Sequence, residues 1–208
     1  FLVVGSPPCT MFSSLQNLSA TKGTAEWERR RREAEVLLTF AAAVYKLQLL
    51  AGRHFLHEHP AGATSWTHPV IAQLRARHGV GAVVAHQCEF GLKTHAEGGG
   101  WASAMKPTRF MSSSPAVLEA LARRCQGGHV HAPLLGGTRA RDAAVYPPAL
   151  CKAIAHGAAE QFRRAHPLSA VRPAAPAGGL CGPPPGRTPH APHHLAARPP
   201  HERHPRHP

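Results

Sequence analysis

Short apolar runs alternate along the chain with longer segments that have helical periodicity. Residues 1–4 form an uninterrupted apolar run, and residues 80–85 form a second one rich in β-branched side chains. Both are predicted to be buried strands. Between them, Thr24 is a suitable N-cap and Gly52 a suitable end for a long helix. The apolar residues that recur at steps of three and four, and that should form its buried face, are Leu37, Phe40, Ala41, Val44 and Leu47.

The rest of the first 160 or so residues continues this alternation. A short strand is expected to end near Glu58, and the later expected elements are a helix over 70–78, an extended segment over 106–111, a helix over 115–124 and a helix that begins at Pro147 and Pro148. Gly98 to Gly100 are expected to form a flexible break. Strands and helices that alternate with short connections predict an α/β fold, with a parallel sheet and helices packed on it.

The chain divides into one domain and a tail. Residues 1–164 are enough to bury a core, whereas residues 165–208 are dominated by Pro, His, Ala, Arg and Gly and are expected to be disordered. No apolar run reaches 18 residues, so neither a transmembrane span nor a membrane partner is expected. Because the sequence begins with Phe inside a predicted strand, we expect a fragment or a processed piece of a longer protein.

Charge and cysteine content narrow the setting in which the protein works. Lys and Arg number 24 against 11 Asp and Glu, a net charge of +13, which suits a polyanionic partner such as DNA. The run Arg29 to Arg32 is interpreted either as a solvated helix face or as phosphate contacts. Five dispersed cysteines do not form a disulfide framework, so we expect a nuclear or cytoplasmic location.

A cysteine directly follows the first predicted strand. The sequence 5–13 reads Gly-Ser-Pro-Pro-Cys-Thr-Met-Phe-Ser, so Cys9 lies on a loop that two prolines stiffen. α/β folds place their ligand sites at the carboxyl ends of strands, and a thiolate is a strong nucleophile. Cys9 is therefore a candidate nucleophile, and the alternative is a buried, inert cysteine in a turn. Glu58, at the end of the next strand, is a candidate acid, and its alternative is a solvated strand-end residue.

Three segments resemble motifs of the DNA (cytosine-5) methyltransferases. Residues 7–13 are similar to that family's Pro-Pro-Cys-Gln-x-Phe-Ser signature, with Thr10 in the place of glutamine. Residues 55–60 are similar to Phe-x-x-Glu-Asn-Val, with His59 and Pro60 at the last two positions. Residues 144–155 resemble the family's closing Pro-Pro-x-Leu element. The match around residues 90–93 is looser.

The resemblance implies a fold and a reaction. The fold would be an incomplete doubly wound, Rossmann-like and mostly parallel sheet with flanking helices. Cys9 would add to carbon 6 of a cytosine in DNA, the Glu58 carboxyl group would bond ring nitrogen 3, and carbon 5 would then take a methyl group from S-adenosylmethionine. The remaining implied site residues are Pro8, Ser13, Lys93, Lys106 and Arg109 for the substrate, and Tyr146 and Pro147 for the cofactor.

One part of the family's pattern is missing. The Phe-x-Gly-x-Gly loop that begins the cofactor site, and the acidic residue on the strand after it, do not occur in this sequence. We therefore expect this chain alone to bind S-adenosylmethionine poorly. Two alternatives stay open: a degenerate, non-catalytic nucleic-acid-binding module, such as one part of a mobile-element polyprotein, and an unrelated cysteine hydrolase whose base would be a nearby histidine.

A last group of residues has metal-binding chemistry. Cys125, His129 and His131 lie close together in the sequence, and a thiolate with two imidazoles can bind zinc. The segment supplies no fourth ligand, which could come from Cys88 or Cys151 only through folding. The alternative, which we adopt at this stage, is a glycine-hinged loop without metal, whose histidines contact phosphate or solvent.

Overall fold

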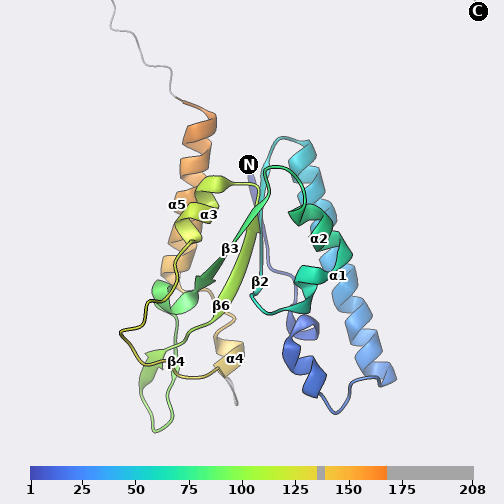
Figure 1. The fold of residues 1–208 in the computed structure, drawn as a ribbon, viewed down its shortest axis with the longest axis vertical. Helices are drawn as coiled ribbons and strands as arrows, with labels where there is room; N and C mark the ends of the chain where they lie inside the picture. Colours follow the sequence, from blue (N-terminus) through green and yellow to red (C-terminus); the bar gives the residue numbers. More distant parts are fainter. Residues whose placement is uncertain (135–138, 168–208) are drawn as a thin grey trace, which may run out of the picture. The chain divides into compact units, whose positions relative to one another are not determined.

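A four-stranded sheet forms the centre of the domain, and its strand order is β1-β2-β6-β3. The computed structural model describes residues 1–134 and 139–167. The strands are β1 (Leu2–Gly5), β2 (His54–Pro60), β3 (Gly81–His86) and β6 (Pro107–Ser112). β1 pairs with β2 in parallel, whereas β6 is antiparallel to both of its neighbours, β2 and β3 (Figure 1).

The mixed pairing corrects one expectation. A mostly parallel sheet was predicted, but two of the three strand pairs are antiparallel because β6 lies between β2 and β3. β1, β2 and β3 nevertheless point the same way, since β2 and β3 are each antiparallel to β6. Their carboxyl ends therefore meet at one edge of the sheet, where the loops after them can form a common site.

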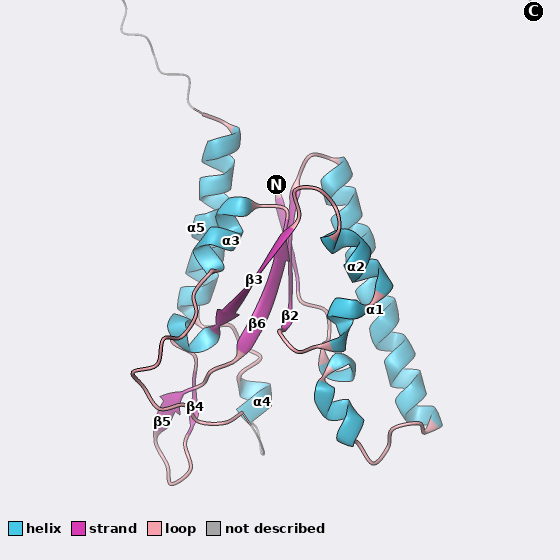
Figure 2. Ribbon diagram, in the orientation of Figure 1, coloured by secondary structure: helices cyan, strands magenta, loops and turns pink. Residues whose placement is uncertain are grey.

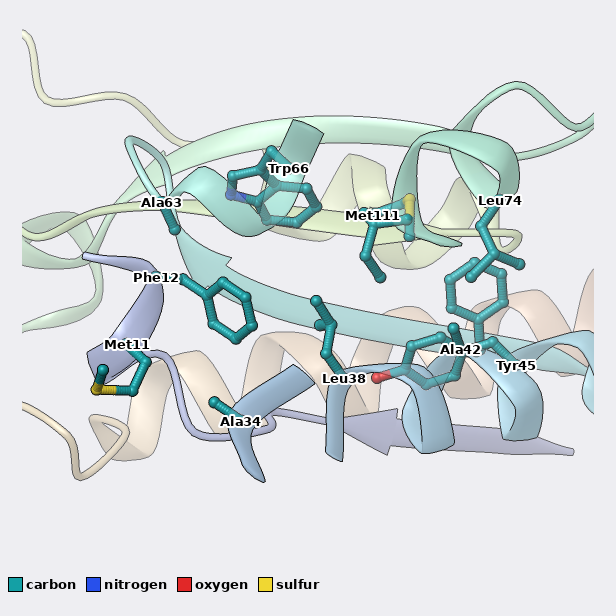
Figure 3. Packing of buried hydrophobic residues seen from close by; sticks show 12 residues of the cluster. Met11, Phe12, Ala34, Leu38, Ala42, Tyr45, Ala63, Trp66, Leu74 and Met111 are labelled. Atoms are coloured by element: carbon teal, nitrogen blue, oxygen red, sulfur yellow. The ribbon is translucent and has the colours of Figure 1, made fainter. Parts of the chain in front are cut away.

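Helices cover both faces of the sheet. α1 (Ala25–Leu50) and α2 (Pro69–Arg75) lie on one side, and α3 (Pro115–Leu121) and α5 (Pro148–Ala165) lie on the other (Figures 1 and 2). Because side chains alternate along a strand, Phe55 of β2 packs toward α1 and α2, and Leu56 packs toward α3 and α5. The architecture is thus an α/β domain with one apolar core on each face of the sheet and a smaller third cluster around Leu92, Ala104 and Ala143. Figure 3 shows the first of these cores.

α1 has the predicted limits but buries a different face. The Thr24 side chain accepts a hydrogen bond from the Trp27 amide at 3.2 Å, as expected of an N-cap. Phe40 of the predicted buried face is 66% exposed, and Leu37 and Leu47 are also exposed. The residues that α1 buries are Ala34, Leu38, Ala42 and Tyr45 (Figure 3). The packing is close, because a Cβ at Gly5 of β1 would overlap the Tyr45 hydroxyl.

α5 packs tightly against α3. It begins at Pro148, and its buried residues include Leu150 and Gly157. A Cβ at Gly157 would lie 2.7 Å from the Cα of Val117, so only glycine lets the two helices approach this closely here. The predicted apolar face is present, since Ile154 and Ala158 also pack against this core.

The other elements lie at the carboxyl edge of the sheet and beyond it. Where only a flexible break was predicted, β4 (Lys93–His95) and β5 (Trp101–Ser103) form a hairpin. Gly98, Gly99 and Gly100 make its turn, with φ between 80° and 97°. α4 (Arg139–Asp142) is short. Ala165 ends α5, and the predicted disordered tail lies outside the described residues from 168 onward.

Two helices are shorter than predicted, since α2 ends at Arg75 and α3 ends at Leu121. The segment after α3 continues without regular structure to the isolated bridge at His131. Among the helices that the structure describes, none combines the length and the apolarity needed to cross a membrane.

Candidate active site

The loop that carries Cys9 is held in place from α1. After β1 the chain passes through the two prolines and turns into the 3-10 helix η1 (Thr10–Phe12), where the Phe12 amide donates to the Cys9 carbonyl at 2.9 Å. Met11 and Phe12 are buried and anchor the loop in the core. Arg31 of α1 donates to the Met11 carbonyl at 2.7 Å, and its guanidinium lies 4.6 Å from the centre of the Phe12 ring. One member of the arginine run therefore positions the loop.

His59 of β2 holds the same loop from the other side. Its Nε2 donates to the Pro7 carbonyl at 2.8 Å, because a carbonyl can only accept. Its Nδ1 must then accept the hydrogen bond from the Ser65 hydroxyl at 2.6 Å. Burial lowers the pKa of His59, which keeps the ring neutral in this tautomer. His59 thus fixes the backbone two residues before Cys9.

Glu58 points to the opposite side of the sheet from His59 and is 4% exposed. Its Oε2 accepts a hydrogen bond from the Ser6 hydroxyl at 2.5 Å and another from the Tyr146 hydroxyl at 3.0 Å. Its Oε1 is buried and has no hydrogen-bond partner among the described residues. A buried polar atom without a partner is unusual and marks a place where a ligand atom can be bound. Neither hydroxyl contact could be read from the sequence spacing.

Glu58 lies near enough to Cys9 for its charge to act on the thiol, although it is not among the residues that line the Cys9 cavity. Burial and the negative charge of Glu58 raise the pKa of the Cys9 thiol, whereas the positive charge of Lys106 opposes that rise. Cys9 and Lys106 both line a cavity of about 590 Å³ at the carboxyl edge of the sheet. The cavity is also lined by Thr10, Ser13 and Pro60. Ser13 additionally caps the next 3-10 turn, through a hydrogen bond from the Leu15 amide at 3.2 Å.

The three basic candidates are not brought to one groove. Lys106 lines the Cys9 cavity and donates to the Ala143 carbonyl at 2.9 Å. Arg109 of β6 lies 5.2 Å from the centre of the Trp66 ring and lines a different hollow, beside β3 and Arg124. Lys93 is exposed on β4. A nucleic acid whose phosphates contact Lys106, Arg109 and Lys93 would therefore have to extend beyond the Cys9 cavity.

The candidate cofactor residues lie at the start of α5. Tyr146 contacts Glu58, and both burial and the Glu58 charge raise the pKa of its phenol, so that it stays a hydrogen-bond donor. Tyr146 also lines an apolar groove of about 570 Å³ between β1 and α5. Pro147 is buried and is the N-cap of α5. Pro8 is exposed and lines a smaller hollow between the β1 loop and α1 instead of the Cys9 cavity.

The cysteine and histidine candidates gather elsewhere. Cys125, His129 and His131 lie together with Cys88, and one ligand atom from each lies within 4.8 Å of all the others. Folding thus brings a fourth side chain with metal-binding chemistry, Cys88, to the three that lie close together in the sequence. The other candidate for that place, Cys151, is exposed on α5 and does not belong to the cluster.

No protein family, curated protein or solved structure matches the chain in the three comparisons that were made. The geometry of Cys9, Glu58 and the surrounding residues is therefore the basis on which a function can be argued.

Proposed function

We propose that this chain carries the base-binding and thiol-addition part of a cytosine-5 methyltransferase-like domain that acts on DNA. The observation that carries the proposal is the pairing of Cys9 and Glu58 at the carboxyl ends of two adjacent parallel strands. The unpartnered Oε1 of Glu58 and the cavity beside Cys9 support it. The target cytosine would be flipped out of the duplex or already single-stranded.

Each group has a role in the addition step. The Cys9 sulfur forms a bond to carbon 6 of cytosine, and the electron pair of the carbon 5–carbon 6 double bond moves into the ring toward nitrogen 3. A Glu58 carboxyl group hydrogen-bonded at nitrogen 3 offsets that charge. Carbon 5 becomes nucleophilic and takes a proton from solvent. Its original hydrogen then leaves as a proton to water, the electron pair re-forms the carbon 5–carbon 6 double bond, and the carbon–sulfur bond breaks to release the Cys9 thiolate. Lys106 favours the thiolate that starts this sequence.

The surface around β1 supports an incomplete doubly wound sheet. Within the described ranges β1 pairs only with β2, so its other edge has free backbone groups. Val4 of β1 is 47% exposed, and α1 exposes Leu37 and Phe40 next to a hollow that all three line. On the other face, β1 and α5 form the apolar groove that contains Tyr146. We propose that a second half-sheet with its own helices covers this surface and pairs with β1.

The methyl donor does not fit the described residues alone. A nucleotide-binding loop needs glycines between a strand and a helix, and Gly98 to Gly100 instead form the turn of a hairpin. We therefore derive no step through S-adenosylmethionine and assign its binding to the proposed second half-sheet, with Tyr146 and Pro147 at the border. We place the activity in the nucleus or cytoplasm, where thiols stay reduced.

A non-catalytic nucleic-acid-binding module is the second candidate function. Two observations favour it: the raised pKa of Cys9, and the departures from the methyltransferase pattern at Thr10, His59 and Pro60. The net charge of +13 would favour binding to DNA in either candidate function and does not distinguish them. In this alternative, which suits one part of a mobile-element polyprotein, the motifs persist without the chemistry.

Exchange of the hydrogen on cytosine carbon 5 tests the proposal with the chain as it is. Addition and reversal at Cys9 should release tritium from a single-stranded oligodeoxynucleotide labelled at carbon 5, and Cys9→Ser should abolish the release. Cys151→Ser is the matched control, because Cys151 is exposed and lies outside the cavity. Binding of the oligonucleotide without tritium release would support the non-catalytic module instead.

A further inference from the structure

We propose that Cys88, Cys125, His129 and His131 form a structural zinc site. This inference is independent of the proposed function, since it concerns a different part of the domain. Cys88 lies in the 3-10 helix η4 (Gln87–Phe90), directly after β3, and the other three ligands lie on the loop that follows α3.

The distances between ligand atoms fit a tetrahedral zinc ion. The Sγ of Cys125 lies 3.6 Å from Nε2 of His129 and 3.6 Å from Nε2 of His131. Bonds of about 2.3 Å from zinc to sulfur and about 2.0–2.1 Å to nitrogen, at tetrahedral angles, place sulfur and nitrogen about 3.5 Å apart. Cys88 completes the set, with every ligand atom within 4.8 Å of the others. Only a small contraction around the ion is needed.

The ligand set identifies the metal and its role. Two thiolates and two imidazoles are a combination that binds zinc, and four protein ligands leave no open position for a substrate. The backbone also prepares the site. The Gly127 amide donates to the Cys125 sulfur at 3.4 Å, which helps to hold the sulfur in place. Gly127 and Gly128 have φ values of 90° and 85°, which allow the tight turn between Cys125 and His129.

The loop has few other means of stabilisation. Between the end of α3 and His131 the chain forms neither helix nor strand, and Val130 is 84% exposed. Its backbone ties include the bond from the His86 amide to the Arg123 carbonyl, at 2.9 Å, the bond from the Cys125 amide to Nδ1 of His86, at 3.1 Å, and a bridge between His131 and Ser103 of β5. A zinc ion would therefore join the end of β3, this loop and the β4–β5 hairpin. The ion would provide the stability that apolar packing provides in the rest of the domain, because the side chains of this segment are largely exposed.

Metal analysis of the protein with residues 1–208 tests the site. The purified protein should contain about one zinc per chain, and the cobalt(II)-substituted protein should show the intense visible absorption of tetrahedral cobalt with a thiolate-to-cobalt charge-transfer band. Cys125→Ser and His129→Ala should each weaken metal binding by more than about 100-fold, beyond the 10- to 100-fold effect of groups that only support a ligand. His129 is exposed, so its replacement should leave the far-ultraviolet circular dichroism unchanged.

Matched variants separate this site from other cysteines and histidines. Cys151→Ser and His78→Ala change exposed residues outside the cluster and should leave the zinc content unchanged. Cys181→Ser controls for residues 168–208, whose sequence contains six histidines. Loss of the cobalt spectrum in Cys181→Ser but not in Cys88→Ser would overturn the proposal. A metal-free protein after purification with zinc, or one with a Cys88–Cys125 disulfide under reducing conditions, would overturn it as well.

Discussion

Nε2 of His59 donates a hydrogen bond to the Pro7 carbonyl oxygen at 2.8 Å and so ties the second strand to the loop that precedes Cys9. Pro7 and Pro8 have no backbone N–H, so this part of the loop can be held only through its carbonyl groups. The second nitrogen of the same ring accepts from Ser65. The position of Cys9 therefore depends on a neutral His59 ring that makes two hydrogen bonds.

His59→Leu should loosen this loop. The substitution leaves the Pro7 carbonyl and the Ser65 hydroxyl without their partner, which costs about 1–3 kcal/mol for each group that stays buried. Urea denaturation should show the lower free energy of unfolding, and Cys9 should become more accessible to alkylation in the folded protein. His78→Leu, at an exposed position, is the control and should change neither quantity. Unchanged alkylation of Cys9 in His59→Leu would contradict the positioning role.

The reactivity of Cys9 should respond in opposite directions to its two charged neighbours. Glu58 raises the pKa of Cys9 and Lys106 lowers it, so Glu58→Gln should speed alkylation by iodoacetamide and Lys106→Met should slow it. Near neutral pH each tenfold change in thiolate fraction corresponds to about 1.4 kcal/mol, and we expect changes of about two- to tenfold. The rate is measured for the Cys9 peptide by mass spectrometry as a function of pH. Lys93→Met, which removes an exposed charge on β4, should leave it unaltered.

Two buried histidines of β2, His57 and His59, should make the protein less stable in acid. Burial lowers the pKa of His57 to about 3, so between that value and its usual 6.5 the unfolded chain binds a proton that the folded chain does not. The free energy of unfolding should therefore fall as the pH drops below 6.5, by up to about 1.4 kcal/mol per pH unit for this group. Burial also lowers the pKa of His59, so this histidine likewise lowers the free energy of unfolding as the pH falls. Urea midpoints at pH 7.5 and pH 5.0 should differ less in His57→Gln than in the parent. Equal differences would show that His57 is not the group responsible.

The sequence predicts those features of the site that depend on local order along the chain. A cysteine after a strand, a carboxylate near the end of the next strand and the Thr24 cap all follow from neighbouring residues, and the structure has each of them. The first strand was predicted to be buried, but β1 is only partly buried and Val4 is exposed. The contacts of Glu58 with Ser6 and Tyr146 could not be predicted, because they join segments 52 and 88 residues apart. For the same reason the sequence could not select Cys88 over Cys151 as the fourth ligand.

The sheet shows a second limit of sequence patterns. The extended segment over 106–111 was expected, and β6 occupies it, but no periodicity indicates that the strand lies antiparallel between β2 and β3. The pattern in α1 was wrong for a different reason. Periodicity locates an apolar face of a helix but does not show which surface packs against it. In the described part of the chain nothing buries the apolar stripe formed by Leu37, Phe40 and Leu47.

That exposed stripe leads to the last prediction. Phe40→Ser and Leu47→Gln change residues that are 66% and 65% exposed, so each should alter the free energy of unfolding by no more than about 0.5 kcal/mol. Leu38→Ala, on the same helix but fully buried, should cost about 2–5 kcal/mol. Urea denaturation compares the three variants directly.

The same variants test what the stripe is for. An apolar surface that awaits a second half-sheet should make the isolated chain self-associate, and Phe40→Ser should reduce that association in sedimentation velocity while Leu38→Ala should not do so in the folded state. If Phe40→Ser destabilises the protein as strongly as Leu38→Ala does, the stripe is already buried within this chain. The incomplete-sheet proposal would then lose its structural support, whereas the thiol chemistry proposed for Cys9 would still be judged by the tritium exchange.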